Sequence, residues 1–402
     1  MVAIANMTKS SSVSQAGNHR KHLWLAALMA VLSLFVHGYL YMQHLALQSG
    51  QYTKSICDIN EKFDCSAVAA SAYAEALHVP VALWGFMANL AFLILVGVYL
   101  LTDENKKPGA RRNLLIAAVG IFAGSLVMGT ISTFLLAKFC AFCMSAYVLS
   151  ILLLIFTWLF VRGSTGSLTI GDFKPLSIVA VICFVGAFIV NSAVTQGGDM
   201  NSPENQAALN GFINDWKAAP AKEFKAVDPL VKGPADAKMT IVEFADYRCI
   251  HCKHAAPILH AFLGSHPDVR LEFQPWPLDG ECNSALNQAN GASCLLARAS
   301  WCAEKNKHSG WSVHDYIYGL PEIYASVDTV RADLGNIASA AGMSIDEMKA
   351  CADSDAAKAA VRAQADVGAT LNLEGTPTIY VNKKQLPGGQ SLPILKKAYE
   401  SL

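Results

Sequence analysis

Apolar stretches dominate the first half of the chain. Five of them hold roughly 18 to 22 residues with almost no charge, which is the length that a helix needs to cross a bilayer. The pattern predicts an all-α membrane bundle of four helices and a fifth, linking helix. We expect the first span to be retained, because a long tail precedes it and no small-residue cleavage site follows it. The expected spans are about 23–42, 81–101, 114–136, 143–161 and 176–194.

The pattern changes after Gln196, where the polar segment "GGDMNSPENQ" predicts a linker, followed by a short helix at about 203–218. The segment "MTIVEFADYRCIHCKHAAPILHAFLGSHPDVRLEFQPW" predicts a buried strand, a turn, a helix and a second strand. Near the C-terminus, "EGTPTIYVNKKQLPGG" predicts two more strands joined by a turn. Alanine, leucine and charged residues at helical spacing over about 285–370 predict a helical insertion in this α/β domain.

Composition supports a membrane protein with thiol chemistry. Hydrophobic residues make up 53% of the chain and charged residues only 15%, which is too apolar for a purely soluble protein. The formal net charge is zero, so nothing indicates a nucleic-acid partner. The 11 cysteines exceed what packing needs and indicate an oxidising compartment or dedicated thiol chemistry.

Positive charges gather on one side of the predicted spans, which identifies that side as cytoplasmic. This orientation puts residues 43–80, 137–142 and everything after about 197 on the outer, oxidising side. The basic residues that determine this orientation are Lys9, Arg20 and Lys21 in the tail, Lys106, Lys107, Arg111 and Arg112 in the loop after the second span, and Arg162 and Lys174 in the loop after the fourth.

Two cysteine pairs lie on the outer side of the membrane half. The loop pair, Cys57 and Cys65, lies in a segment whose aspartates and asparagine predict turns and mobility. The CAFC pair, Cys140 and Cys143, begins the fourth span on one helix face, where the helix dipole favours a thiolate. A mobile pair beside a fixed pair predicts disulfide exchange. A tetrahedral zinc site made by the four cysteines is the alternative.

A third pair, the CIHC pair of Cys249 and Cys252, lies between a predicted strand and a predicted helix. That context is the thioredoxin-type redox signature. In the thioredoxin fold, which this context resembles, a cis-proline stands against the cysteine pair, and Pro377 in the Thr-Pro segment near the C-terminus is the candidate.

Four further cysteines of this domain predict two structural disulfides. Three connectivities are possible. We favour Cys282–Cys294, within one loop, and Cys302–Cys351, which would join two helices.

The membrane half resembles the vitamin K epoxide reductase family. "CDINEKFDCSAVAAS" matches that family's C-D-x6-C-S loop followed by a serine, and "KFCAFCMSAY" matches its F-C-x-x-C-x3-Y motif. With four spans in the right order, the likeness covers about residues 20–165. The resemblance implies that the loop pair (Cys57, Cys65) shuttles electrons and that the CAFC pair (Cys140, Cys143) is the redox centre beside a quinone.

The same resemblance places Ser71 at the family's loop serine and Tyr147 at its pocket tyrosine. A flat, apolar quinone suits a bundle core lined by aromatic residues, so Trp84 is a further candidate for the pocket. Ordinary packing is the alternative for each aromatic residue, and a helix cap for Ser71. Val81 stands where vertebrate members have an asparagine, which puts epoxide reduction in doubt more than quinone reduction. The other aromatics considered are Phe86, Phe122 and Phe134.

The second half is similar to the DsbA-like branch of the thioredoxin superfamily, over about residues 220–402. The likeness rests on "CIHC", "GTPT" and the helical insertion. It implies that Cys249 is the nucleophile and Cys252 the resolving thiol, and that His251 favours an oxidising potential by stabilising the Cys249 thiolate. Glu243 matches the family's buried acid, which would relay protons; a surface or salt-bridged glutamate is the alternative.

Together these features predict a membrane thiol–disulfide oxidoreductase that forms disulfides in exported proteins. Electrons would pass from reduced substrate proteins to the CIHC pair, the loop pair, the CAFC pair and a membrane quinone, either ubiquinone or menaquinone. A disulfide reductase or isomerase is one alternative. A non-enzymatic binding or chaperone module with structural or zinc-binding cysteines is the other.

The expected location is the bacterial inner (plasma) membrane, with the C-terminal domain on the periplasmic side. The predicted domains are a cytoplasmic tail at 1–22, a four-helix bundle at 23–165, a fifth helix and linker at 166–200, and a thioredoxin-fold domain at 201–402.

Overall fold

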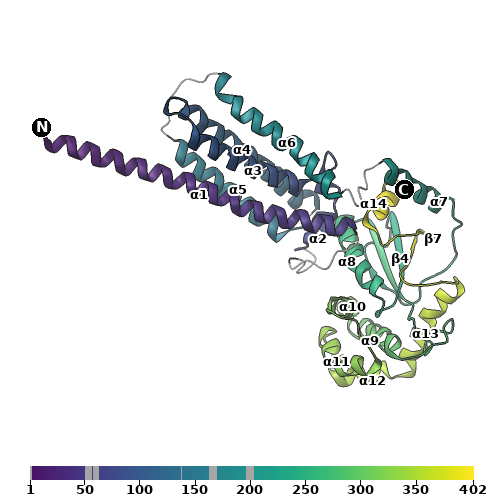
Figure 1. Cartoon of the computed structure of the whole chain (residues 1–402). Coiled ribbons are helices and arrows are strands. Elements are labelled where there is room, and N and C mark those ends of the chain that lie inside the picture. The colour runs from purple at the N-terminus through teal and green to yellow at the C-terminus, as the bar shows by residue number, and fades with distance from the viewer. Residues whose placement is uncertain (1, 50–56, 58–62, 137, 163–169, 196–202) are drawn as a thin grey trace. The chain divides into compact units, whose positions relative to one another are not determined.

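The structure is a computed structural model that describes residues 2–49, 57, 63–136, 138–162, 170–195 and 203–402 (Figure 1). It forms two compact units. The first comprises Met1–Leu45 and Ser55–Asp199, and the second comprises Ala46–Lys54 and Met200–Leu402.

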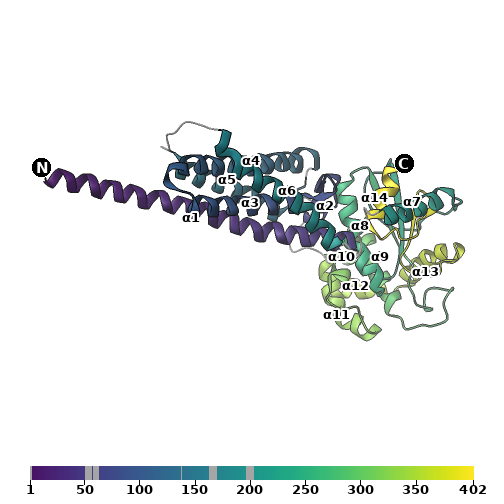
Figure 2. The same cartoon turned by 45° about the horizontal axis from the view of Figure 1, so that its top comes forward.

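The first unit is built from α1 (Val2–Ser49), α3 (Val81–Leu101), α4 (Lys107–Thr130), α5 (Ala141–Val161) and α6 (Lys174–Thr195). Within the described residues, five helices are long and apolar enough to cross a membrane, which confirms the predicted number of spans. α4 packs against α3 and α5, and α3 also packs against α6 (Figure 2). Large side chains such as Phe92, Leu114 and Phe160 fill the core between them.

The predicted loop after the second span is wrong in part, because α4 already begins at Lys107. Arg111 and Arg112 are therefore helical. Pro108 lies in the first turn, where its fixed φ suits the helix and its missing N–H costs nothing. The Arg111 guanidinium lies 5.8 Å from the ring centroid of Tyr99. Hydropathy marks where the chain becomes apolar rather than where the helix begins.

Short elements connect the long helices. Asp64 caps α2, since its carboxylate accepts a hydrogen bond from the Ala67 N–H at 2.8 Å. The turns predicted at Asp58 and Asn60 lie outside the described residues. The short elements are α2 (Cys65–Ala70), η1 (Ala72–Ala74), the hairpin of β1 (Glu75–Ala76) and β2 (Val79–Pro80), η2 (Glu104–Lys106), the π-helical turn η3 (Ile131–Leu136) and η4 (Ile170–Phe173).

A five-stranded sheet organises the second unit, in the order β3-β5-β4-β6-β7. β4 runs parallel to β5 and antiparallel to β6. Because side chains alternate along a strand, Val242 and Phe244 of β4 pack with Tyr380 and α13, whereas Glu243 and Ala245 face α8. The strands are β3 (Leu230–Lys232), β4 (Met239–Ala245), β5 (Val269–Pro275), β6 (Thr378–Val381) and β7 (Lys384–Gln385).

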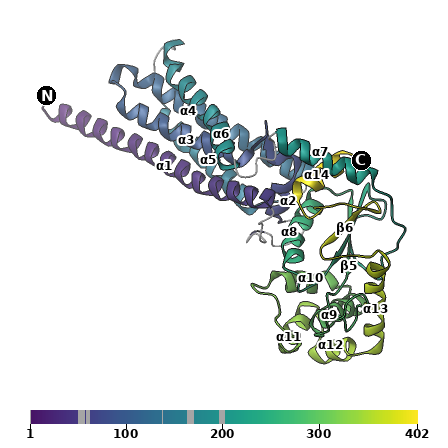
Figure 3. The same cartoon turned by 45° about the vertical axis from the view of Figure 1, so that its right-hand side comes forward.

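The predicted helical insertion is confirmed as five helices between β5 and β6 (Figure 3). α9 contacts the four others. Capping boxes at Ser326 and Ser344 fix where α11 and α12 begin. The insertion comprises α9 (Ala292–Lys307), α10 (Gly310–Gly319), α11 (Val327–Ala340), α12 (Ile345–Ala352) and α13 (Asp355–Thr370); α7 (Pro203–Ala218), α8 (Ile250–Ser265) and α14 (Leu392–Glu400) complete the unit.

Both favoured structural disulfides are confirmed. Cys282–Cys294 ties a loop to α9, with the two Cα atoms 5.9 Å apart. Cys302–Cys351 ties α9 to α12, at 6.0 Å. The insertion therefore has a covalent frame of the kind that exported domains use.

We expect Gly368→Ala to destabilise the second unit by roughly 1–3 kcal/mol, as overpacking does. A Cβ on Gly368 would lie 2.3 Å from Cδ1 of Trp276, whose side chain is buried. Gly335→Ala in α11 is the matched control, because its nearest neighbour would lie at 3.6 Å and alanine favours a helix. Thermal unfolding of both variants tests this, and equal midpoints for Gly368→Ala and wild type would contradict the packing.

Candidate redox centres

The CAFC pair lies where α5 begins. Cys140 is the residue before the first turn, and its sulfur accepts a hydrogen bond from the Cys143 N–H at 3.1 Å. The sulfur therefore occupies the N-cap position that a serine or aspartate oxygen usually fills. There it faces the positive end of the helix dipole, which favours a thiolate.

A main-chain bridge brings the loop pair to the CAFC pair. Phe63 and Phe139 form an isolated β-bridge, and the Asp64 N–H donates to the Phe139 carbonyl at 2.9 Å. Because Cys65 follows Asp64 and Cys140 follows Phe139, the bridge sets the two cysteines side by side. The loop-pair disulfide and Cys140 form a buried cluster whose three sulfurs lie within 4.8 Å of one another. This is the approach that thiol–disulfide exchange needs.

The bonding of the loop pair bears on the zinc alternative. Cys57 and Cys65 are joined as a disulfide, with their Cα atoms 5.8 Å apart. Zinc binds thiolates, and a structural zinc site uses four such ligands. Since a disulfide sulfur is not a thiolate, this arrangement favours thiol exchange.

A cavity of about 480 Å³ opens beside the CAFC pair inside the first unit. α1, α3, α4 and α5 provide most of its wall, which is largely apolar. Both CAFC cysteines line it together with Tyr147, Ser71 and Trp84, so the structure brings the predicted quinone-pocket residues together. Its volume and character are those of a small-molecule site.

Two of these residues also have structural contacts. The Ser71 hydroxyl donates to the Val68 carbonyl at 2.8 Å at the end of α2. The Trp84 indole N–H donates to the Ala76 carbonyl at 3.0 Å, and its ring packs against Phe184 and Phe188 of α6.

The three other aromatics that the sequence suggested lie elsewhere. Phe86 packs against the helix core. Phe122 and Phe134 line a separate hollow of about 330 Å³ between α4 and α5, and Phe134 is 78% exposed. This hollow shares Cys140 and Tyr147 with the larger cavity.

Among the polar residues of the cavity wall that sequence analysis missed are two histidines of α1, His37 and His44, and the amide of Asn89 in α3. His44 pairs with Glu75 at 3.2 Å. A signal for them existed, because polar side chains inside an apolar span are costly and tend to mark functional sites.

The CIHC pair has two unlike thiols. Cys249 is the N-cap residue of α8, and Cys252 lies buried in the first turn. Hydrogen bonds from the Cys252 thiol and from the backbone N–H groups of Cys252 and His251 lower the pKa of Cys249 to about 5. Burial raises the pKa of Cys252 well above its usual value. At neutral pH, Cys249 is therefore a half-buried thiolate and Cys252 a buried thiol. The His251 side chain itself is exposed.

Pro377 stands against the pair as expected. The Thr376–Pro377 bond is cis, and the Cys249 sulfur lies 3.3 Å from the Thr376 carbonyl, to which it donates a hydrogen bond when it is protonated. The loop that carries the cis-proline thus contacts the reactive sulfur directly.

Glu243 lies beneath the pair. It shares a strand face with Ala245, which packs against Cys252. Its side chain is 1% exposed, so it is a buried acid rather than a surface residue. Burial, with the nearby Cys249 thiolate, raises its pKa to about 8. A carboxyl group with that pKa can exchange a proton near neutral pH.

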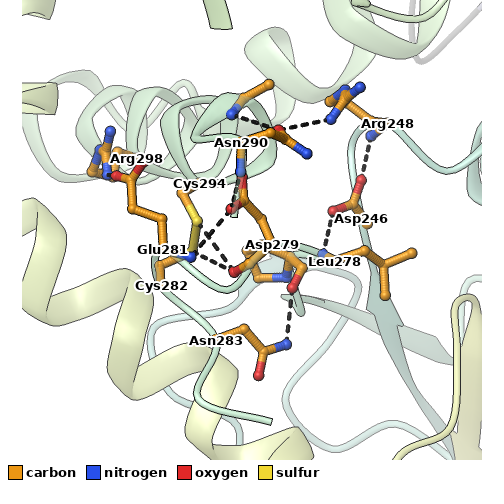
Figure 4. Close-up of a disulfide and its surroundings, with 12 residues drawn as sticks. Asp246, Arg248, Leu278, Asp279, Glu281, Cys282, Asn283, Asn290, Cys294 and Arg298 are labelled. Carbon is orange, nitrogen blue, oxygen red and sulfur yellow. Dashed lines mark hydrogen bonds and ion pairs between the residues drawn. A yellow bond between two sulfur atoms is a disulfide. The ribbon is translucent and has the colours of Figure 1, made fainter. Parts of the chain in front are cut away.

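The turn before Cys249 is held by a buried carboxylate that the sequence did not single out (Figure 4). Asp246 accepts hydrogen bonds from the N–H groups of Arg248 and Leu278 at 2.5 and 2.6 Å. The Asp246 carbonyl accepts from the Cys249 N–H at 3.0 Å. These hydrogen bonds hold the turn that positions the Cys249 sulfur.

The same network reaches the Cys282–Cys294 disulfide (Figure 4). The Arg248 guanidinium donates to the Asn290 side-chain oxygen at 2.9 Å. The Asn290 N–H donates to the Asp279 carboxylate at 3.0 Å, and the Asp279 carbonyl accepts from the Cys282 N–H at 3.3 Å. The disulfide therefore braces the loop that positions Cys249.

Comparison with known proteins identifies both halves. Residues 24–158 match the model of the vitamin K epoxide reductase family, and residues 225–400 match a thioredoxin model. The chain thus joins a domain that matches the vitamin K epoxide reductase family model to a domain that matches a thioredoxin model. It is a multi-pass membrane protein with five candidate spans among its described helices, and both domains belong to thiol–disulfide oxidoreductase families.

Similar proteins are of two kinds. Disulfide bond formation protein D of Bacillus subtilis is 24% identical over 175 residues, which are 42% of this chain and 75% of that protein. The Na(+)/H(+) antiporter NhaA 3 of Salinispora tropica is 25% identical over 172 residues, or 42% of this chain. The chain spans only 24% of the length of that antiporter.

Among solved structures, oxidised BdbD from Bacillus subtilis is 25% identical to the chain, with a TM-score of 0.39. The match covers 46% of this chain and 97% of that structure.

We expect alkylation of reduced Cys249 in membranes to stay fast from neutral pH down to about pH 5 and to fall below it, because its pKa is about 5. Cys252→Ala removes the thiol that donates to Cys249 and should move the midpoint upward. The measurement is the rate of iodoacetamide labelling against pH, located by mass spectrometry. A wild-type midpoint near that of an ordinary cysteine would contradict the thiolate assignment.

Glu243→Gln should stabilise the protein more at pH 8 than at pH 5. An unfolded glutamate ionises near its ordinary value of 4.5, whereas the folded carboxyl holds its proton until about pH 8. The wild type therefore loses stability as the pH rises through this window, and glutamine does not titrate. Melting temperatures of both proteins across this range test the sign. A difference that stays constant with pH would show that Glu243 is not a buried acid.

Proposed function

We propose that this protein forms disulfides in exported proteins by passing electrons from substrate thiols to a membrane quinone. The order is the CIHC pair, the loop pair, the CAFC pair and then ubiquinone or menaquinone. The observation that supports it best is the buried contact between the loop-pair disulfide and Cys140, beside an apolar cavity. A relay of this kind needs neighbouring pairs and an acceptor dissolved in the membrane.

The first exchange takes place at the oxidised CIHC pair. A substrate thiolate attacks the sulfur of Cys249, and Cys252 leaves and takes a proton. A second substrate thiol then displaces Cys249 as a thiolate, which its pKa of about 5 makes a good leaving group. The substrate has lost two electrons and two protons, and the CIHC pair has gained the two electrons.

The later exchanges move the same electron pair into the membrane unit. The Cys249 thiolate attacks the loop-pair disulfide, and Cys252 resolves the mixed disulfide after giving its proton to the ionised fraction of Glu243, which a pKa of about 8 leaves available near neutral pH. A loop-pair thiolate then attacks the CAFC disulfide at Cys140, the sulfur within reach of the loop pair. Cys143 leaves on the cavity side. Joining both units in one chain raises the effective concentration of the partners, to the millimolar scale for a short linker.

The cavity residues fit a quinone. A head group would lie among Cys143, Tyr147, Ser71 and Trp84, against a wall that is largely apolar. When bound, the quinone supplies the acceptor for the two electrons and two protons of the reduced CAFC pair. The smaller hollow between α4 and α5, with its exposed apolar rim, supports access from the lipid side.

The low pKa of Cys249 supports the oxidative direction over the reductase or isomerase alternative. A stabilised thiolate makes the reduced CIHC pair stable, and its disulfide is then a strong oxidant. We place the protein in a bacterial inner membrane, with the thioredoxin-type domain, residues 201–402, on the periplasmic side. The basic residues of the loops support this orientation.

Alkylation trapping of thiols in intact membranes tests the proposal. In wild type we expect the CIHC pair to be mainly oxidised. Cys140→Ser, or depletion of quinone, should leave it mainly reduced, because electrons can no longer leave. Cys183→Ser is the matched control, since Cys183 is a buried membrane cysteine outside the relay. A CIHC pair that stays oxidised in both the Cys140→Ser variant and quinone-depleted membranes would falsify the relay.

A further inference from the structure

Two polar side chains that the relay does not use line the cavity near one glycine, Gly85. Asn89 of α3 and His37 of α1 both line it, and both contact Gly85. The Asn89 side chain is 1% exposed, inside a helix that crosses the membrane. A buried amide in such a position is costly and calls for a partner.

The hydrogen bonds of Asn89 are incomplete. Its amide nitrogen donates one hydrogen to the Gly85 carbonyl at 2.8 Å. Its side-chain oxygen is buried and has no hydrogen-bond partner among the described residues. An amide offers two donors and an acceptor, so one N–H and the oxygen are left for a ligand in the cavity. Leaving a buried polar atom unsatisfied costs roughly 1–3 kcal/mol.

His37 is held in one tautomer. Its Nδ1 lies 2.8 Å from the Ser33 carbonyl, which can only accept, so Nδ1 carries a hydrogen. The neutral ring therefore presents Nε2 as an acceptor, and the protonated ring presents it as a donor. Nε2 lies close against α3: a Cβ on Gly85 would come within 2.2 Å of it. Because Gly85 has no side chain, the His37 ring can lie against α3 at this position.

The ligand chemistry follows from these groups. A quinone oxygen accepts hydrogen bonds, and the corresponding hydroquinone oxygen also donates one. Asn89 can serve both forms, through its remaining N–H and its oxygen, and His37 can accept or donate at Nε2. Val81, the first residue of α3, also lines the cavity but is apolar. Asn89 lies eight residues further along the same helix, a rise of about 12 Å.

We propose that Asn89 and His37 bind the quinone head group, with the Asn89 amide hydrogen-bonded to a quinone oxygen and His37 beside it. The proposal rests on the proposed function, because it requires the cavity to hold a quinone. The polar contact of the head group would then lie where His37 of α1 approaches Gly85 of α3.

The test is equilibrium binding to the purified full chain with the CAFC pair oxidised, so that no turnover occurs. Isothermal titration calorimetry with a short-chain ubiquinone and a short-chain menaquinone gives Kd. We expect Asn89→Leu, which keeps the volume but removes the amide, to raise Kd about tenfold, equivalent to about 1.4 kcal/mol. His37→Leu should also raise Kd, and His37→Gln should recover part of the loss because glutamine can still hydrogen-bond.

Asn113→Leu is the matched control. Asn113 is 2% exposed, donates to the Asp172 carbonyl at 2.7 Å, and has a buried side-chain oxygen with no partner among the described residues. It does not line the cavity, so its variant should bind quinone as wild type does. If Asn89→Leu does not fold, the two His37 variants carry the test.

The outcomes separate the two proposals. Quinone binding by wild type that neither Asn89→Leu nor His37→Leu weakens would overturn this inference and leave the relay standing. An equal loss in Asn113→Leu would also overturn it, because the effect would then belong to any buried amide. Absence of binding by wild type would contradict the quinone step itself.

Discussion

One main-chain hydrogen bond sets the geometry of the membrane unit. The Asp64 N–H donates to the Phe139 carbonyl just before the first residues of two cysteine-bearing elements, α2 and α5. The bridge joins the two segments at the residues that immediately precede Cys65 and Cys140. With it, three sulfurs come together in a buried cluster beside the cavity. The contact joins distant parts of the chain through main-chain atoms, so it does not depend on the side chains of Asp64 and Phe139.

In the thioredoxin-type unit, two neighbouring thiols have very different pKa values. The start of α8 supplies hydrogen bonds to Cys249, and burial keeps Cys252 protonated. Glu243 lies beneath both and holds a proton near neutral pH. Asp246 and Arg248 hold the turn, and the Cys282–Cys294 disulfide braces the loop they contact. One strand, the start of one helix and one loop held by a disulfide therefore position the nucleophile, the resolving thiol and the acid.

Much of this was predictable from the sequence, for physical reasons. The spans and the strand–helix context of the CIHC pair follow from hydropathy and periodicity. The cis bond before Pro377 was expected from the likeness to the thioredoxin fold. The two structural disulfides were the favoured choice among three connectivities that the four cysteines allow. The start of α4 could not be predicted, because hydropathy does not report a helix that extends beyond the apolar core. The Phe63–Phe139 bridge could not be predicted either, since a single bridge leaves no periodic pattern in the sequence. Asn89 and His37 were overlooked because isolated polar residues hardly change the mean hydropathy of a span, although their high cost in lipid is a signal.

The central claim is that electrons pass from the CIHC pair to the loop pair within this chain. Cys252→Ser tests it most directly, because Cys249 can then attack the loop-pair disulfide but nothing resolves the product. The account predicts that mass spectrometry of the variant from membranes finds Cys249 disulfide-linked to Cys57 or Cys65. Cys249 linked to exported proteins, but never to either loop cysteine, would contradict it.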